Sequence, residues 1–252
     1  MKWMLGVAAL GCAIIWAIPG GAADPKDKGL EDADVKALVE ANDKIIQDAL
    51  SQTKVTKALK LKARTAALMI AAAAQSGGAA RNAQLATQRD AAIKIAEALD
   101  QDKVADALDV AKLLATLKPD PNVKLDAVPL IDKSINLDDV MNQFAGERGG
   151  GLVIESKLEK WEDEAPKELA EVNEAALQMQ LIFEVARDHK LTTKQAGLGT
   201  PEKWQKFVDA ARGRTTELRA AAGKGDKDGV QKAAKAVNMA CMDCHKVFRP
   251  RN

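Results

Sequence analysis

The residues best suited to chemistry stand together near the C-terminus, as the pentapeptide Cys241-Met242-Asp243-Cys244-His245. Two cysteines separated by two residues and followed by histidine form the attachment signal for c-type haem, in which both thiols bond to vinyl groups and the imidazole ligates iron. In a helix, positions 241, 244 and 245 lie on neighbouring lines of one face, so the three groups can reach one planar macrocycle. The motif therefore predicts one covalently attached haem c, with His245 as an iron ligand.

Two other uses of a cysteine pair fit the sequence less well. A zinc site needs a second pair of ligands, whereas the only other histidine of the chain is His189, alone in a polar stretch. A thioredoxin-like dithiol needs its cysteines at the start of a helix that follows a strand, whereas this pair closes a helical pattern. Haem attachment is the interpretation that the surrounding sequence favours.

The wider sequence around the motif resembles a known family. Cys-x-x-Cys-His-x-x-Phe-Arg ends at Arg249, and it follows Trp204-x-x-Phe207, an alanine-rich segment and Gly225-Asp226. This order of motifs resembles that of the class II c-type cytochromes, the cytochrome c-prime group. The resemblance is close from about residue 201 to Arg249 and looser from about residue 137 to residue 201. The resemblance implies an antiparallel four-helix bundle with haem packed between helices near one end.

The last helical pattern places both cysteines on an apolar seam. Its members recur at spacings of four and three: Val230, Ala234, Val237, Cys241, Cys244 and Phe248. We therefore expect the haem to replace core side chains, with Phe248 beside it. Arg249 lies one helical turn after His245, so we expect its guanidinium near the haem, where the resemblance suggests a hydrogen bond to a propionate.

The resemblance also bears on the second axial position of the iron. In six-coordinate class II cytochromes a methionine from the first helix of the bundle ligates iron and the protein carries electrons. Five-coordinate members place an apolar residue there and bind gases such as nitric oxide. Met141 lies in the expected segment and is the candidate metal ligand, with Met179 next. Electron transfer is the leading interpretation, and no enzymatic activity is expected. Two alternatives stay open: gas binding by the haem, and a non-redox role in which the N-terminal half docks a partner.

The first 23 residues predict export. Lys2 precedes an apolar run from Trp3 to Ile18, and small residues follow up to Ala23, where we expect a signal peptide (1–23) to be cleaved. The run is shorter than the ~20 apolar residues of a spanning helix, so no stable membrane anchor is expected. Because c-type haem is attached outside the cytoplasm in this family, the predicted location is periplasmic or otherwise exported.

Composition predicts an all-α protein without a nucleic-acid partner. Charged residues make up 29% of the chain and aromatic residues 3%, and no alternating apolar segments compete with the helical patterns. Lys and Arg total 37 against 36 for Asp and Glu, so no basic field argues for nucleic acid. We expect a redox partner protein whose identity the sequence does not give, and homodimer formation stays open.

Helical periodicity predicts two antiparallel four-helix bundles in tandem. Four amphipathic patterns, at about residues 31–50, 55–75, 80–99 and 103–117, predict a haem-free domain over residues 24–118. Pro119, Pro121 and Pro129 mark a linker over residues 119–136, and the haem domain is expected at 137–252. The two halves of the chain resemble each other loosely, which predicts an internal repeat. In the first half, Leu113, Leu114 and Leu117 occupy the positions at which the second half has its haem-binding residues.

Overall fold

The computed structural model describes residues 30–114, 116–126, 130–146 and 151–249. Within these residues the regular secondary structure is helical, and the only β-type pairing is a single bridge between Ile131 and Ile135. The expected all-α fold class is therefore confirmed. The predicted signal peptide, residues 1–23, lies outside the described residues. No helix in the described part of the chain is long and apolar enough to cross a membrane.

Four helices make up the first part of the fold, which we call the N-terminal helix group. They are α1 (Asp32–Leu50), α2 (Lys57–Ser76), α3 (Ala83–Asp100) and α4 (Val104–Leu114). Each helix packs against the next, and α4 packs back against α1. Side-chain caps set two of the starts: the Thr56 hydroxyl accepts from the Leu59 N–H, and the Asn82 amide oxygen accepts from the N–H groups at the start of α3.

Helix α2 is buried on all sides in its C-terminal half. Every residue from Thr65 to Ala74 is buried, and six of these ten are alanine. A helix that is apolar around its whole circumference belongs in the interior, and alanine lets neighbouring helices approach closely. In agreement with this, α2 packs not only against α1 and α3 but also against α7 of the second part of the fold.

The remaining elements form the C-terminal helix group. They are α5 (Leu137–Met141), the 3₁₀ turn η1 (Asn142–Phe144), α6 (Ile154–Asp163), α7 (Leu169–Arg187), α8 (Thr193–Ala196), α9 (Pro201–Gly223) and α10 (Lys227–Phe248). Helix α9 packs against both α7 and α10, and α6 packs against α10. Helix α6 was not predicted from the sequence. The buried side chains of α6 nevertheless have helical spacing: Ile154, Leu158 and Trp161.

Gly151 and Val153, just before α6, pack against the residue that follows η1 and fix where α6 begins. Gly151 lies so close to the preceding backbone that a Cβ atom there would be 2.2 Å from the carbonyl oxygen of Ala145. Val153 follows with φ 60°, a left-handed conformation that is unfavourable for a β-branched residue. The N–H of Val153 donates to the same Ala145 oxygen at 3.0 Å. These contacts therefore hold the start of α6 beside the end of η1.

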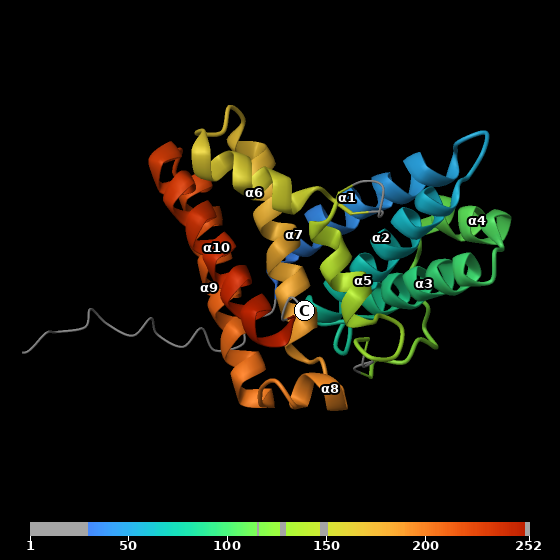
Figure 1. Cartoon of the computed structure of the whole chain (residues 1–252). Helices are drawn as coiled ribbons and strands as arrows, with labels where there is room; N and C mark the ends of the chain where they lie inside the picture. Colours follow the sequence, from blue (N-terminus) through green and yellow to red (C-terminus); the bar gives the residue numbers. More distant parts are fainter. Residues whose placement is uncertain (1–29, 115, 127–129, 147–150, 250–252) are drawn as a thin grey trace, which may run out of the picture.

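The two helix groups pack directly against each other. In Figure 1, α7 lies between α1 to α4 on one side and α9 and α10 on the other, and α7 packs against α2 and α1. Polar contacts cross the same boundary: Arg219 pairs with Asp34, and Arg64 pairs with Asp139 at 2.9 Å. The buried hydrophobic core runs without interruption through both groups. The expected domain division at residues 119–136 stays a prediction about folding units.

Candidate haem-attachment site

The motif occupies the last two turns of α10, a helix fixed at its start by a side-chain cap. The Asp226 carboxylate accepts from the N–H of Gly229 at 2.8 Å. Cys241 and Cys244, near the other end of the helix, are half-buried free thiols that pack at the margin of the hydrophobic core. Their neighbours toward solvent, Met242 and Asp243, are exposed. Both thiols thus point along the core side of α10, as the seam predicted.

Both motif thiols stay protonated at neutral pH. Burial raises the pKa of Cys241 to about 12, with smaller contributions from Cys244 and Glu155. Burial likewise raises the pKa of Cys244 to about 11. A redox-active dithiol has the opposite property, because its reactivity depends on a lowered thiol pKa. The environment of these thiols therefore argues against a thioredoxin-like role.

His245 and Arg249 lie together at the end of α10. Partial burial and the positive charge of Arg249 lower the pKa of His245, and the Glu155 carboxylate opposes them. A lowered pKa favours the neutral imidazole, which is the form that ligates metals. The backbone N–H of Arg249 donates to the carbonyl of His245 at 2.9 Å, while its side chain is exposed. Two thiols one turn apart and a neutral imidazole beside them fit the donor set of a c-type haem.

Helix α6 faces the motif, which sequence reasoning missed. Glu155, in the first turn of α6, is near enough to influence the pKa of both Cys241 and His245. At the other end of α6, Glu162 pairs with Lys235 and accepts from the Asn238 amide at 3.1 Å. The two helices therefore run in opposite directions along each other. The i, i+4, i+7 apolar spacing of α6 is the signal that could have found it.

An aromatic cluster borders the motif on the side of α9. The Phe248 ring stands edge-on to Trp204, with centroids 5.2 Å apart, and to Phe207 at 6.2 Å. The Trp204 indole is buried and donates to the carbonyl of Ala186 at 3.0 Å, which ties α9 to α7. Gly199 lies against the Phe248 ring, where a Cβ atom would be 2.7 Å from Cζ. The cluster gives the site an apolar wall.

His189, which the sequence left isolated, is part of the support for this wall. Its side chain is 5% exposed, its Nδ1 lies 2.7 Å from an Asp132 carboxylate oxygen, and its ring meets Trp204 edge-on with centroids 5.6 Å apart. Asp132 also accepts from the Lys190 N–H at 2.7 Å. This histidine therefore holds residues 130–135 against the end of α7. Across the described residues no cluster of three or more His, Cys, Asp or Glu could hold a bare metal ion.

The two candidate methionine ligands lie on other elements. Met141 is the last residue of α5, is half-buried, and packs against the hydrophobic core. Helix α5 packs against α7 and η1, whereas α10 packs against α6 and α9. Met179 is fully buried within α7. The structure thus brings Cys241, Cys244 and His245 together, with ligation by Met141 remaining a prediction.

Comparison with known proteins agrees with the site. Residues 143–249 match the protein family described as Cytochrome C', a span that includes α6, α7, α9 and α10 and the whole motif. Neither the curated proteins nor the solved structures gave a match to this chain. The family expected for the C-terminal half is therefore confirmed, because residues 143–249 match cytochrome c-prime.

Proposed function

We propose that this chain is an exported mono-haem c-type cytochrome that transfers electrons. The observation that carries the proposal is the arrangement at the end of α10, where two protonated thiols lie at the core margin beside His245. Cys241 and Cys244 would hold the haem through thioethers, and His245 would ligate its iron. The haem, when bound, supplies the one-electron iron centre. Trp204 and Phe248 form an apolar wall on one side of the site.

The proposed haem bundle consists of α6, α7, α9 and α10, and α1 to α4 form a second bundle without haem. Helix α6 runs along α10, α10 along α9, and α9 along α7, and Lys157 of α6 pairs with Glu171 of α7 at 3.1 Å to close the ring. Residues 30–126 contain neither cysteine nor histidine, so the N-terminal helix group has no ligand for a haem of this kind. It would act as a rigid support for α7, or as a docking unit for a partner.

Met141 is the proposed sixth ligand for an electron carrier. A thioether favours ferrous iron and raises the reduction potential, and a filled sixth position closes the iron to exogenous gases. Ligation would require α5, which packs against α7, to approach the end of α10.

Gas binding by five-coordinate iron is the second candidate function, and one observation favours it. Helix α6, which faces the motif, contains neither methionine nor histidine, and its inward side chains are apolar. An apolar residue on the free face of the haem would leave an open position for nitric oxide or carbon monoxide.

The attachment proposal is tested by replacing both motif cysteines. Cys241→Ala with Cys244→Ala should give an exported protein from which acidified acetone removes all haem, whereas haem stays with the unmodified chain. Ser76→Ala, at the end of α2, is the matched control and should keep its haem. Covalent haem in the double variant would overturn the proposal.

The two candidate functions are separated by the ferrous spectrum. A Met141 ligand predicts a low-spin ferrous protein that binds carbon monoxide slowly, and Met141→Ala should make it high-spin and fast-binding. Met179→Ala tests the second candidate ligand: if this variant alone changes the spin state, the sixth ligand comes from α7. A high-spin spectrum and free carbon monoxide binding in the unmodified protein would instead favour gas binding.

A further inference from the structure

His189 lies just beyond the end of α7, and two separate segments hold its ring. Its Nδ1 lies 2.7 Å from Oδ1 of Asp132, and its Nε2 lies 3.2 Å from Oε1 of Gln195. An ionised carboxylate only accepts hydrogen bonds, so Nδ1 carries the hydrogen and donates to Asp132. With a side chain that is 5% exposed, His189 is a buried clamp between residues 130–135 and helix α8.

Both partners of His189 are themselves fixed by backbone hydrogen bonds. The N–H of Asp132 donates to the carbonyl of Ile135 at 2.7 Å, and its second carboxylate oxygen accepts from the N–H of Lys190 at 2.7 Å. The Gln195 oxygen also accepts from the N–H of Thr192 at 2.8 Å, in the capping box that begins α8. The ring therefore cannot turn without breaking contacts to both segments.

Two paths of contact lead from this clamp to the haem-attachment motif. The His189 ring meets Trp204 edge-on, with centroids 5.6 Å apart, and Trp204 meets Phe248 edge-on at 5.2 Å. Gly199, in the loop that follows α8, lies against the Phe248 ring. Phe248 stands one helical turn after His245 in α10. A displacement of the clamp would therefore move the aromatic side chain beside the proposed iron ligand.

We propose that His189 is a positioning residue of the haem site, which holds the wall formed by Trp204 and Phe248 in place. This inference rests on the proposed haem assignment. The apolar shell around a metal centre limits the access of water and so tunes its reduction potential. A loosened wall would admit water, which stabilises the more highly charged ferric state and lowers the potential. A histidine that only tied two loops together would change the stability of the fold and leave the potential unchanged.

Two substitutions of Asp132 separate the clamp from charge and backbone strain. Asp132 has φ 64°, a conformation that glycine adopts freely and asparagine tolerates. Asp132→Gly and Asp132→Asn remove the same negative charge, but the asparagine oxygen can still accept from His189. In the full-length haem-loaded protein, the equilibrium constant for one-electron reduction should be at least about threefold lower, or about 28 mV, in Asp132→Gly than in Asp132→Asn. Gln195→Ala, which removes the contact at Nε2, should lower the potential in the same direction relative to the unmodified protein.

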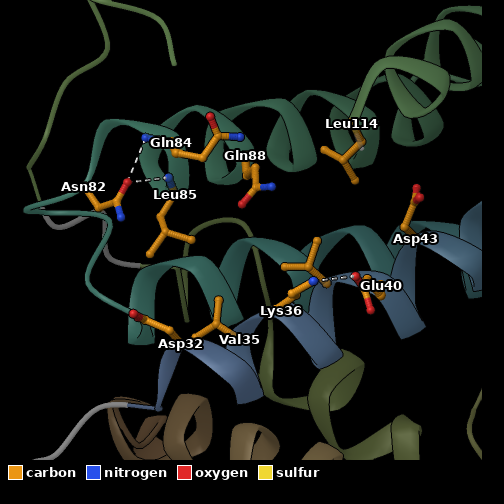
Figure 2. A pocket seen from close by; sticks show the side chains of 11 residues that line it. Asp32, Val35, Lys36, Glu40, Asp43, Asn82, Gln84, Leu85, Gln88 and Leu114 are labelled. Carbon is orange, nitrogen blue, oxygen red and sulfur yellow. Dashed lines mark hydrogen bonds and ion pairs between the residues drawn. The ribbon is translucent and has the colours of Figure 1, made fainter. Parts of the chain in front are cut away.

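Leu85→Ala is the control for a general loss of stability in the same spectroelectrochemical titration. Figure 2 shows Leu85 extending from α3 toward α1, so its truncation weakens packing within the N-terminal helix group. The melting temperature of Leu85→Ala should fall, and its reduction potential should equal that of the unmodified protein. The melting temperature of every variant verifies that the fold is intact during the titration.

The indole resonance of Trp204 gives a measurement that needs no haem. The double variant Cys241→Ala, Cys244→Ala should carry no covalent haem. In that background, Asp132→Gly should shift the indole N–H resonance of Trp204. The corresponding resonance of Trp161, in α6, should keep its position.

Three results would overturn the inference: equal potentials in Asp132→Gly and Asp132→Asn, a similar fall of the potential in Leu85→Ala, or an unchanged Trp204 resonance. An unmodified protein without covalent haem would instead reject the proposed function. The Trp204 resonance would still show whether His189 holds the wall, so the two failures are distinguishable.

Discussion

The ion pair between Asp34 and Arg219 should couple the two helix groups energetically. Arg219 of α9 reaches both carboxylate oxygens of Asp34 in α1, with Nη1 2.7 Å from Oδ2, across 185 residues of sequence. Its Nε also donates to the Asn173 amide oxygen at 3.3 Å. The side chains are 28% exposed for Arg219 and 16% for Asp34. A bidentate guanidinium–carboxylate pair of this kind is stronger than a single surface contact.

The expected magnitude follows from the burial of this pair. Fully exposed pairs contribute about 0.2–1 kcal/mol, and breaking a fully buried pair costs about 3–5 kcal/mol. Because both side chains retain some solvent contact, we expect a coupling energy of about 1–2 kcal/mol between Asp34 and Arg219. Each single alanine variant should lower the free energy of unfolding by at least this amount, since it leaves the partner charge partly buried.

A double-mutant cycle measured by urea unfolding tests this magnitude. The cycle uses Asp34→Ala, Arg219→Ala and the combined variant. The matched control is the pair Arg214 and Glu217, which lies within α9 and is 52% and 56% exposed. Its coupling should be about 0.5 kcal/mol or less. A coupling for Asp34 and Arg219 no larger than the control would refute the inference that this pair joins the groups.

Three further changes have expected outcomes. Gly151→Ala should lower the free energy of unfolding by about 1–3 kcal/mol, because the new Cβ would overlap the Ala145 carbonyl; Gly146→Ala, where a Cβ meets nothing within 4 Å, is the control in the same urea titration. Arg89→Leu should lower the free energy of unfolding by about 3 kcal/mol, because the buried guanidinium donates to the carbonyls of Lys124 and Asp126 at 3.0 and 2.7 Å. Faster proteolysis at residues 120–126 would show that these two hydrogen bonds are lost. Asp43→Asn should raise the melting temperature at pH 7. Burial raises the pKa of Asp43 in the folded state, so ionisation of this carboxyl group destabilises the fold as pH rises, and the neutral asparagine avoids this penalty. Below pH 3.8, where Asp43 is protonated in both states, the two proteins should have similar melting temperatures. A higher melting temperature for the unmodified protein at pH 7 would contradict that sign.

The grouping of the candidate site residues could be predicted from the sequence because it depends on neighbours in the chain. The spacing of Cys241, Cys244 and His245 puts them on one face of any helix, whatever surrounds it. The bounds of α1, α2 and α3 came within a few residues of the expected ranges, because apolar periodicity and caps such as Asn82 are local signals. The all-α class followed from the same periodicity.

Local signals were weaker where the backbone departs from regular geometry. The separate start of α6 at Ile154 was not predicted from the sequence. The left-handed Val153 and the close packing of Gly151 decide this geometry. Neither is visible in a hydrophobic pattern, because a β-branched residue rarely adopts that conformation.

What the sequence alone determined is the helical class and the position of Cys241, Cys244 and His245 at the end of one helix, since both are encoded within a few turns of chain. Only the tertiary structure decided how the helices are shared between the two groups. Asn42 and Gln178 meet at 3.4 Å across 136 residues, and the alanine-rich α2 is buried between helices of both groups. Such contacts depend on which apolar faces cover one another in three dimensions. An amphipathic pattern states that a face must be covered, but not by which helix.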